Sequence, residues 1–372
     1  MQLTNKIHFR NLQGDLFGGV TAAVIALPMA LAFGVASGAG AASGLWGAVL
    51  VGFFASLFGG TPTLISEPTG PMTVIMTAVI ANLVAADPEN GMAMAFTVVM
   101  MAGVFQIIFG SLRLGKYVTM MPYTVISGFM SGIGIILVIL QLAPFLGQAS
   151  PPGGVVGTLQ SIPTLLANIQ PAETMLAATA VAIIWFMPAK MRRLVPPQLI
   201  ALIAGTVLSL LLFPDVDIRR IGEIPMGFPA LQTPTFSFDQ LQLMFVDAAV
   251  LGMLGCIDAL LTSVVADSLT RTEHNSNKEL IGQGIGNIMS GLFGGIAGAG
   301  ATMGTVVNIQ TGGRTALSGL VRASVLLVVI LGAANLAATI PLAVLAGIAL
   351  KVGIDFIDWD FLVPIRFPLR VP

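Results

Sequence analysis

Asp258 is the residue whose position points most directly to chemistry. It lies within a long apolar run at 243–267, and a carboxylate at membrane depth costs at least about 2.5 kcal/mol to insert, so such residues mark functional sites by default. Thr262 follows four residues later and shares the same face of a helix. A carboxylate, a hydroxyl and nearby carbonyl oxygens suit a hard cation. The alternative is a protonated Asp258 that makes a structural hydrogen bond.

Two threonines follow stretches that disfavour helices. Thr69 comes after the proline-containing segment 61–68 and begins an apolar run of about 14 residues. Thr302 comes after the glycine- and alanine-rich segment 296–301 and begins a still shorter run. Both runs are shorter than the roughly 20 residues that span a bilayer. The sequence therefore predicts two half-helices preceded by short extended segments, with Thr69 and Thr302 as their N-caps.

Two helix starts that face one another form an anion site without a basic side chain. Each start presents unpaired N–H groups and about half a positive charge, and anions bind there. Gly300 and Ala301 directly precede the second start, where free carbonyls would complete a cation shell. The alternative is that the threonines only cap helix ends, which is compatible with anion binding because the other N–H groups still need a partner.

The composition indicates the environment in which these residues must work. Of 372 residues only 9% are charged and 56% are hydrophobic, with a mean hydropathy of +0.94, whereas a soluble domain has about 25% charged residues. We therefore expect an all-α polytopic membrane protein in contact with the lipid bilayer. The net charge of −1 gives no basic footprint for nucleic acid. With one cysteine and no nucleophile–base pair, the chain is not expected to be an enzyme.

Apolar runs between the charged residues predict twelve membrane spans. They lie at 15–37, 42–59, 70–85, 94–110, 123–145, 173–189, 196–213, 243–267, 279–296, 302–312, 316–334 and 336–353. The first run lacks a small-residue cleavage site followed by soluble sequence, so it is predicted to be a retained span rather than a signal peptide.

The basic residues predict the orientation. With a cytoplasmic N-terminus in the plasma (inner) membrane, fourteen basic residues fall on the cytoplasmic side and only Arg219 and Arg220 outside, as the positive-inside rule requires. The fourteen are Lys6, Arg10, Arg113, Lys116, Lys190, Arg192, Arg193, Arg271, Lys278, Arg314, Arg322, Lys351, Arg366 and Arg370. Most acidic residues are expected in loops or at span ends, which leaves Asp258 nearly alone at membrane depth.

The two half-helix regions also resemble each other. The tetrapeptide LFGG occurs at 57–60 and again at 292–295, and each copy is followed by a Thr-Val pair, at 73–74 and 305–306. Repeats that are broken at corresponding positions indicate a transporter with its site at the bilayer midplane. The alternative is a chance recurrence in a chain with 43 glycines.

Several blocks in a fixed order carry a family resemblance. They are ALPMALAF at 26–33, GLW at 44–46, GGTP through EPTGP at 59–71, NKEL at 277–280, GN at 286–287, LFGG at 292–295 and GGRT at 312–315. In these blocks the chain resembles the SulP (sulfate permease) family of anion transporters, from about residue 10 to 360, and within the family it is most similar to sodium-dependent bicarbonate transporters.

The resemblance implies an inverted 7+7 repeat with two domains. The core domain would comprise about 10–115 and 240–315, and the gate domain about 116–213 and 316–372. Family members continue with two further spans and a cytoplasmic STAS domain, which are absent from this chain, so we expect a truncated transport domain. The full-length protein is expected to be a homodimer.

The resemblance also assigns roles to individual residues. It implies bicarbonate contacts at Thr69, Gly70, Ala301 and Thr302, and sodium ligands at Asp258, Thr262, Gly300 and Thr302. Many relatives carry a basic residue just inside the second half-helix, but segment 302–308 has none. Positive charge must then come from helix dipoles and a bound cation, which favours Na⁺ as the coupling ion, with no other cofactor.

The expected activity is therefore sodium-dependent import of bicarbonate by alternating access. Moving a monovalent anion inward against an interior-negative potential costs about 2.3 kcal/mol per 100 mV, which one co-transported Na⁺ cancels. Two alternatives remain open at this point. One is a proton- or sodium-coupled transporter of sulfate or another oxyanion, and the other is an anion channel.

Overall fold

The computed structural model describes residues 4–5, 7, 9–118, 120, 122–192, 195–225 and 227–359. Within them are twelve helices of at least nine residues, namely α1 (Leu12–Ala36), α2 (Ala41–Phe58), α3 (Gly70–Ala86), α4 (Gly91–Ser111), α6 (Tyr123–Phe145), α9 (Pro171–Phe186), α11 (Pro197–Leu212), α12 (Leu241–Thr270), α13 (Ser276–Leu292), α14 (Thr302–Gln310), α15 (Ala316–Ala337) and α16 (Leu342–Phe356). The shorter helical elements are η1 (Phe9–Asn11), α5 (Gly115–Val118), α7 (Gly154–Gln160), α8 (Ile162–Ala167) and α10 (Ala189–Arg192).

Each of the twelve predicted spans corresponds to one of the twelve longer helices, which confirms the helical part of the sequence prediction. Six of these helices are long and apolar enough to cross a membrane, and α3, α9 and α11 are shorter apolar helices. Four residues of the orientation argument lie outside the described residues, as does the end of the predicted gate domain at 360–372. These four are Lys6, Arg193, Arg366 and Arg370.

Two short strands join the two halves of the chain. Strand β1 (Ser66–Glu67) pairs antiparallel with β2 (Ala299–Gly300), so that Ser66 lies opposite Gly300. The N–H of Ala301 extends the pairing by donating to the Ile65 carbonyl at 2.8 Å. Each strand directly precedes a half-helix, α3 or α14, as the sequence predicted. The pairing therefore brings two helix starts together from distant parts of the chain.

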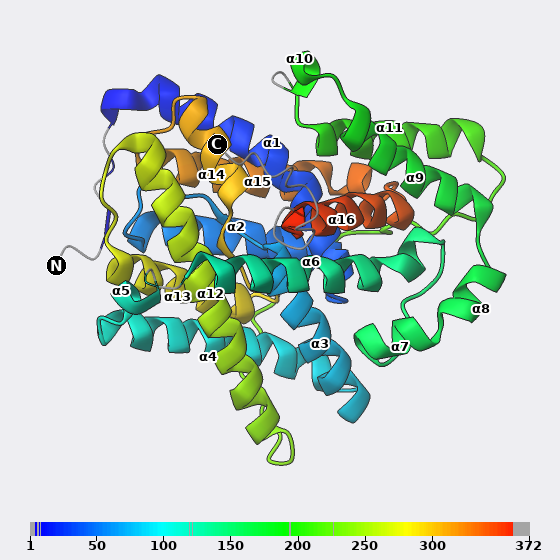
Figure 1. Cartoon of the computed structure of the whole chain (residues 1–372), viewed down its shortest axis with the longest axis horizontal. Helices are drawn as coiled ribbons and strands as arrows, with labels where there is room; N and C mark the ends of the chain where they lie inside the picture. Colours follow the sequence, from blue (N-terminus) through cyan, green and yellow to red (C-terminus); the bar gives the residue numbers. More distant parts are fainter. Residues whose placement is uncertain are drawn as a thin grey trace, which may run out of the picture.

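The strand pair lies within tightly packed helices. Buried apolar side chains of α3, α4, α6 and α12 form one cluster with residues in and just before β2, while α1, α2, α9, α11, α15 and α16 meet in a second cluster. Helices α4 and α13 approach closely, because a Cβ on Gly103 or Gly284 would lie 2.5 Å from the carbonyl oxygen of the other. Small residues at such crossings are typical of membrane helix packing. Figure 1 shows α12 crossing α4 obliquely, with α3 beside them.

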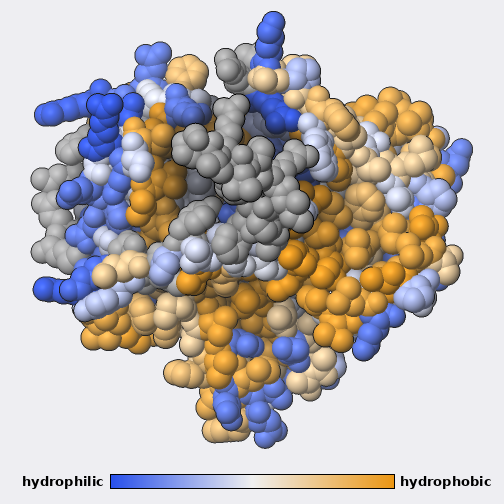
Figure 2. Space-filling model, in the orientation of Figure 1, coloured by the Kyte–Doolittle hydropathy of each residue, from blue (hydrophilic) through white to orange (hydrophobic). Residues whose placement is uncertain are grey.

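The outer surface is largely apolar. Figure 2 shows hydrophobic side chains over much of the right-hand and lower part of the molecule, and hydrophilic ones gathered towards the left and upper edges. Large exposed apolar side chains include Phe186, Leu211, Phe245 and Leu336, each more than 60% exposed. Such a surface is suited to lipid rather than to water.

Candidate functional site

The start of α3 places Thr69 against Asp258. Thr69 is the N-cap residue of α3, as predicted, with an extended backbone. Its hydroxyl does not cap the helix, however, but donates to Oδ2 of Asp258 at 2.7 Å. The first N–H groups of α3 are therefore left without a side-chain cap, and they remain available to an anion.

The start of α14 corrects one sequence prediction. The N-cap is Ala301 rather than Thr302, which is the first residue of the helix. The physical reason is the strand pairing: Ala301 stays extended while its N–H donates to Ile65, so the helix begins one residue later. Thr302 instead directs its hydroxyl to that of Thr262, with the two oxygens 3.0 Å apart.

Helix α12 connects the two starts. Asp258 and Thr262 lie one turn apart on it; the first contacts Thr69, and the second donates its hydroxyl to the Gly300 carbonyl at 2.9 Å. The structure thus brings together all the predicted site residues, with Gly70 and Ala301 adjoining these contacts in the chain. Thr262 is fully buried, whereas Thr302 is exposed. The cluster is therefore accessible from the Thr302 side.

The cluster has the chemistry of a small cation site. It offers a carboxylate at Asp258, the hydroxyls of Thr262 and Thr302, and the carbonyl of Gly300. All of these donors are oxygens, which hard cations such as Na⁺ prefer. The one carboxylate among these groups gives the cluster the charge that would balance a monovalent cation.

Gly70 is required by a close approach of α16. A Cβ at Gly70 would lie 2.1 Å from Cε2 of Phe356, near the end of that helix. The aromatic ring therefore lies directly against the first turn of α3. Any side chain at position 70 would displace either the ring or the helix start.

Arg322 was placed on the cytoplasmic side by the sequence analysis, and that placement is wrong. It lies within α15, is completely buried, and forms an ion pair with Glu67 of β1. Its guanidinium also donates to the carbonyls of Ser66 and Ala48, each at 2.9 Å. The Arg322 side chain thus lies behind β1, and Asp258 is not the only ionisable residue inside the bundle. The sequence did contain a signal, namely two opposite charges in apolar surroundings. Glu67 lies at the edge of the predicted span 70–85, and Arg322 lies within the predicted span 316–334.

Side chains of α13 hold the extended segments in place, and sequence analysis missed them. Gln283 donates to the Ser66 hydroxyl at 2.6 Å and to Glu279, whose carboxylate accepts from the backbone N–H groups of Gly60 and Thr61. Asn287 bonds both the N–H and the carbonyl of Gly298 ahead of β2. Their spacing of four residues on one helix face was the signal that could have revealed them.

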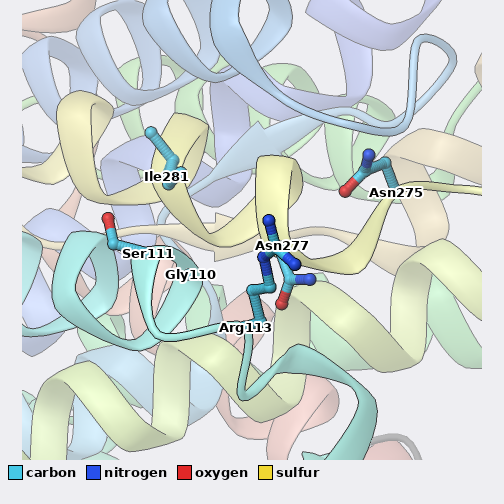
Figure 3. Close-up of a pocket in the computed structure, with 6 residues that line it drawn as sticks. All are labelled: Gly110, Ser111, Arg113, Asn275, Asn277 and Ile281. Carbon is cyan, nitrogen blue, oxygen red and sulfur yellow. The ribbon is translucent and has the colours of Figure 1, made fainter. Parts of the chain in front are cut away.

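A cavity of about 610 Å³ lies elsewhere, between the end of α4 and the start of α13. Figure 3 shows the side chains of Arg113 and Asn277 beside one another in it. Its other lining residues are Gly110, Ser111, Asn275 and Ile281. None of the predicted site residues lines this cavity, so it is separate from the cluster at the helix starts.

Comparison with known proteins identifies the family. The sequence model of the sulfate permease family matches residues 12–367. The chain belongs to the sulfate permease family. Two relatives in the family, both named bicarbonate transporter BicA, are 81% identical over 362 residues in Synechocystis sp. and 80% identical over 366 residues in Picosynechococcus sp.; each alignment covers 97% of this chain. The chain spans only 64% and 65% of their lengths.

Two solved structures confirm the fold. The transmembrane domain of a cyanobacterial BicA matches with a TM-score of 0.95 at 80% identity, covering 99% of this chain and 94% of that one. Murine Slc26a9 in its inward-facing state matches with a TM-score of 0.84 at 19% identity, covering 97% and 64%. The predicted all-α, inverted-repeat transporter fold is therefore confirmed, and the chain is a multi-pass membrane protein.

Proposed function

We propose that this chain is the transport domain of a sodium-coupled bicarbonate importer. The observation that carries the proposal is the contact of both half-helix starts with one face of α12: Thr69 bonds Asp258, and Thr302 meets Thr262. The proposed anion and cation sites then adjoin each other along this face of α12. The 80–81% identity to proteins named bicarbonate transporter supports bicarbonate as the anion.

The anion is held between the two helix starts. The backbone N–H groups at Gly70 and Thr302 belong to the first turns of α3 and α14 and have no partner within their own helices. Thr69 and Ala301 flank these groups and complete the proposed contacts. Bicarbonate has three oxygens and one negative charge, which suits convergent N–H donors and two helix dipoles.

Sodium binds beside the anion, and each ion improves the site for the other. Asp258, Thr262, Gly300 and Thr302 supply the oxygens, and the bound Na⁺ adds the positive charge that segment 302–308 lacks. The two ions carry opposite charges and attract each other in the low-dielectric interior. Binding of one ion therefore raises the affinity for the other. A 1:1 stoichiometry makes import electrically neutral.

Transport follows from movement of a core domain against a gate domain. We assign the core to about 10–115 and 240–315 and the gate to about 116–213 and 316–372, with the N-terminus cytoplasmic and the protein in the plasma membrane as a homodimer when full-length. The contact between Phe356 and Gly70 lies across this proposed boundary. Movement of Phe356 away from the start of α3 would expose the anion site.

The deciding experiment measures radiolabelled bicarbonate uptake into proteoliposomes with and without an inward sodium gradient. Wild-type uptake should require Na⁺, and Asp258→Asn should reduce it at least 100-fold because the cation loses its only charged ligand. Asp247→Asn is the matched control, since this carboxylate lies on the same helix outside the cluster. Sodium-dependent uptake by Asp258→Asn would refute the assignment. Uptake of labelled sulfate instead of bicarbonate would favour sulfate as the substrate, as in the name of a 35% identical relative, the putative sulfate transporter YvdB of Bacillus subtilis.

A further inference from the structure

The Glu67–Arg322 ion pair lies one layer behind the proposed anion site. Glu67 is three residues before Gly70, so its backbone is within about 10 Å of the first turn of α3, at roughly 3.3 Å per extended residue. The carboxylate comes nearer to the other helix start, because a Cβ on Gly304, in the first turn of α14, would lie 3.5 Å from Oε1 of Glu67. Glu67 therefore lies close to both helix starts.

The two charges of the pair compensate each other within the bundle. Arg322 is completely buried and the Glu67 side chain is 7% exposed, so neither charge is screened by water. The guanidinium meets the carboxylate and two backbone carbonyls, and its Nε has no partner among the described residues. A neutral amide could bond the same carbonyls, so positioning β1 alone does not require an ion pair at this place, where buried charges are expensive.

We propose that the Glu67–Arg322 pair determines the charge preference of the transporter, by keeping the layer behind the helix starts neutral so that the site selects monovalent over divalent oxyanions. The inference rests on the proposed function only in placing the anion between α3 and α14. Removing one charge of the pair changes the electrostatic potential at the site. The binding energy of a divalent anion then changes by twice as much as that of a monovalent one. At about 10 Å and an effective dielectric constant near 20, one unit charge alters the preference roughly 10-fold.

Removing the carboxylate and removing the guanidinium are expected to have different effects on the preference. Glu67→Gln leaves Arg322 uncompensated, and the more positive site should favour sulfate over bicarbonate by about 10-fold relative to wild type. Arg322→Gln leaves Glu67 buried without its cation. A carboxyl group in that position takes up a proton and becomes neutral, so the preference should stay near that of the wild type. The double variant is neutral again and should return to the wild-type preference, as should Arg322→Lys, which keeps the charge without the guanidinium fork.

The test measures the ratio of kcat/KM for labelled sulfate to that for labelled bicarbonate in proteoliposomes. A ratio is independent of the fraction of protein that is active, so partial misfolding of a variant does not imitate the effect. Glu173→Gln is the matched control: it removes the carboxylate of another ion pair, with Arg219 at 2.8 Å, on α9. Its ratio should equal that of the wild type.

A shift towards sulfate in Glu67→Gln and its reversal in the double variant would support the proposal. A ratio within two-fold of wild type in Glu67→Gln would overturn it; should that variant not fold, a ratio in Arg322→Lys as far from wild type as roughly 10-fold would do the same, because that variant keeps both charges. If the wild type carries no bicarbonate, the proposed function fails, and the charge preference is then read from sulfate against nitrate in the same variants.

Discussion

The two half-helix regions share a backbone plan but differ in chemistry. In both, a two-residue strand leads into a helix, yet α3 has 17 residues and α14 only nine. The first strand carries Glu67 and is backed by Arg322, whereas the second, Ala299–Gly300, carries no charge and offers a carbonyl to Thr262. Repetition of the backbone therefore supplies two helix starts, while divergence of the side chains supplies distinct surroundings for an anion and a cation.

The two helix starts also differ in how far neighbouring side chains enclose them. Phe356 lies against Gly70 at the start of α3, with an atom 2.1 Å from a would-be Cβ, but Gly304 in α14 faces the side chain of Ile65, with the nearest atom 3.1 Å from a would-be Cβ. Thr69 is 7% exposed, while Thr302 is exposed. The first start is thus enclosed and the second open in this conformation.

The largest effect is expected from adding a methyl group at the enclosed start. Gly70→Ala should reduce bicarbonate uptake at least 100-fold, because its Cβ would overlap the Phe356 ring and overpacking costs about 1–3 kcal/mol even before the site is distorted. Gly304→Ala, the matched change at the open start, should remain within a few-fold of wild type. Adding Phe356→Ala to Gly70→Ala should recover part of the uptake. Equal losses in the two single variants would show that the starts do not differ in this way.

A smaller effect is expected from removing one hydroxyl at each start. Thr302→Val should raise the KM for Na⁺ about 10-fold, which corresponds to one lost hydrogen bond or ligand of about 1–1.5 kcal/mol, because Thr302 meets Thr262 within the oxygen cluster. Thr302→Ser keeps the hydroxyl and should behave as wild type. Thr69→Val should raise the KM for bicarbonate and for Na⁺ together, since its hydroxyl bonds Asp258. Sodium titrations of uptake at saturating bicarbonate separate the two; identical sodium curves for Thr302→Val and wild type would contradict the assignment.

The smallest effect concerns the far end of α3. The Asn90 side chain and the Asn90 and Glu89 backbone N–H groups bond the exposed Asp87 carboxylate and hold its pKa below the ordinary value. A lowered pKa in the folded state means that this contribution to stability is present above the unfolded pKa and is lost as the pH falls through the folded pKa. Asp87→Asn should therefore lower the Tm only slightly at pH 7, and the difference should vanish in acid. A difference that grows on acidification would contradict this sign.

The spans and the half-helices were predictable because membrane solvation imposes them on the sequence. A helix in lipid must be a long apolar run, and the segments 61–68 and 296–301 contain the residues that interrupt one. Asp258 was recognisable for the same reason, since its carboxylate stands within such a run. These signals are local and need no knowledge of the partner elements.

The residues that the sequence analysis misplaced or missed owe their positions to contacts between distant segments of the chain. Arg322 was counted among the cytoplasmic basic residues, although it lies within the predicted span 316–334, because its partner Glu67 is 255 residues away in the chain. The N-cap of α14 moved to Ala301 because of a bond to Ile65, which no pattern around residue 302 reveals. Gln283 and Asn287 similarly act on backbone groups that only the folded chain brings to them.

The pairing of β1 with β2 also constrains how the protein is assembled in the membrane. Ser66 pairs with Gly300, 234 positions later in the chain, so the first strand has no partner until the second half of the chain has been inserted. An unpaired strand edge is unfavourable in lipid, and closure over so long a loop is slow. During synthesis the first half-helix must therefore wait in a protein-lined or hydrated environment, and we expect the ion site to be among the last parts of the molecule to form.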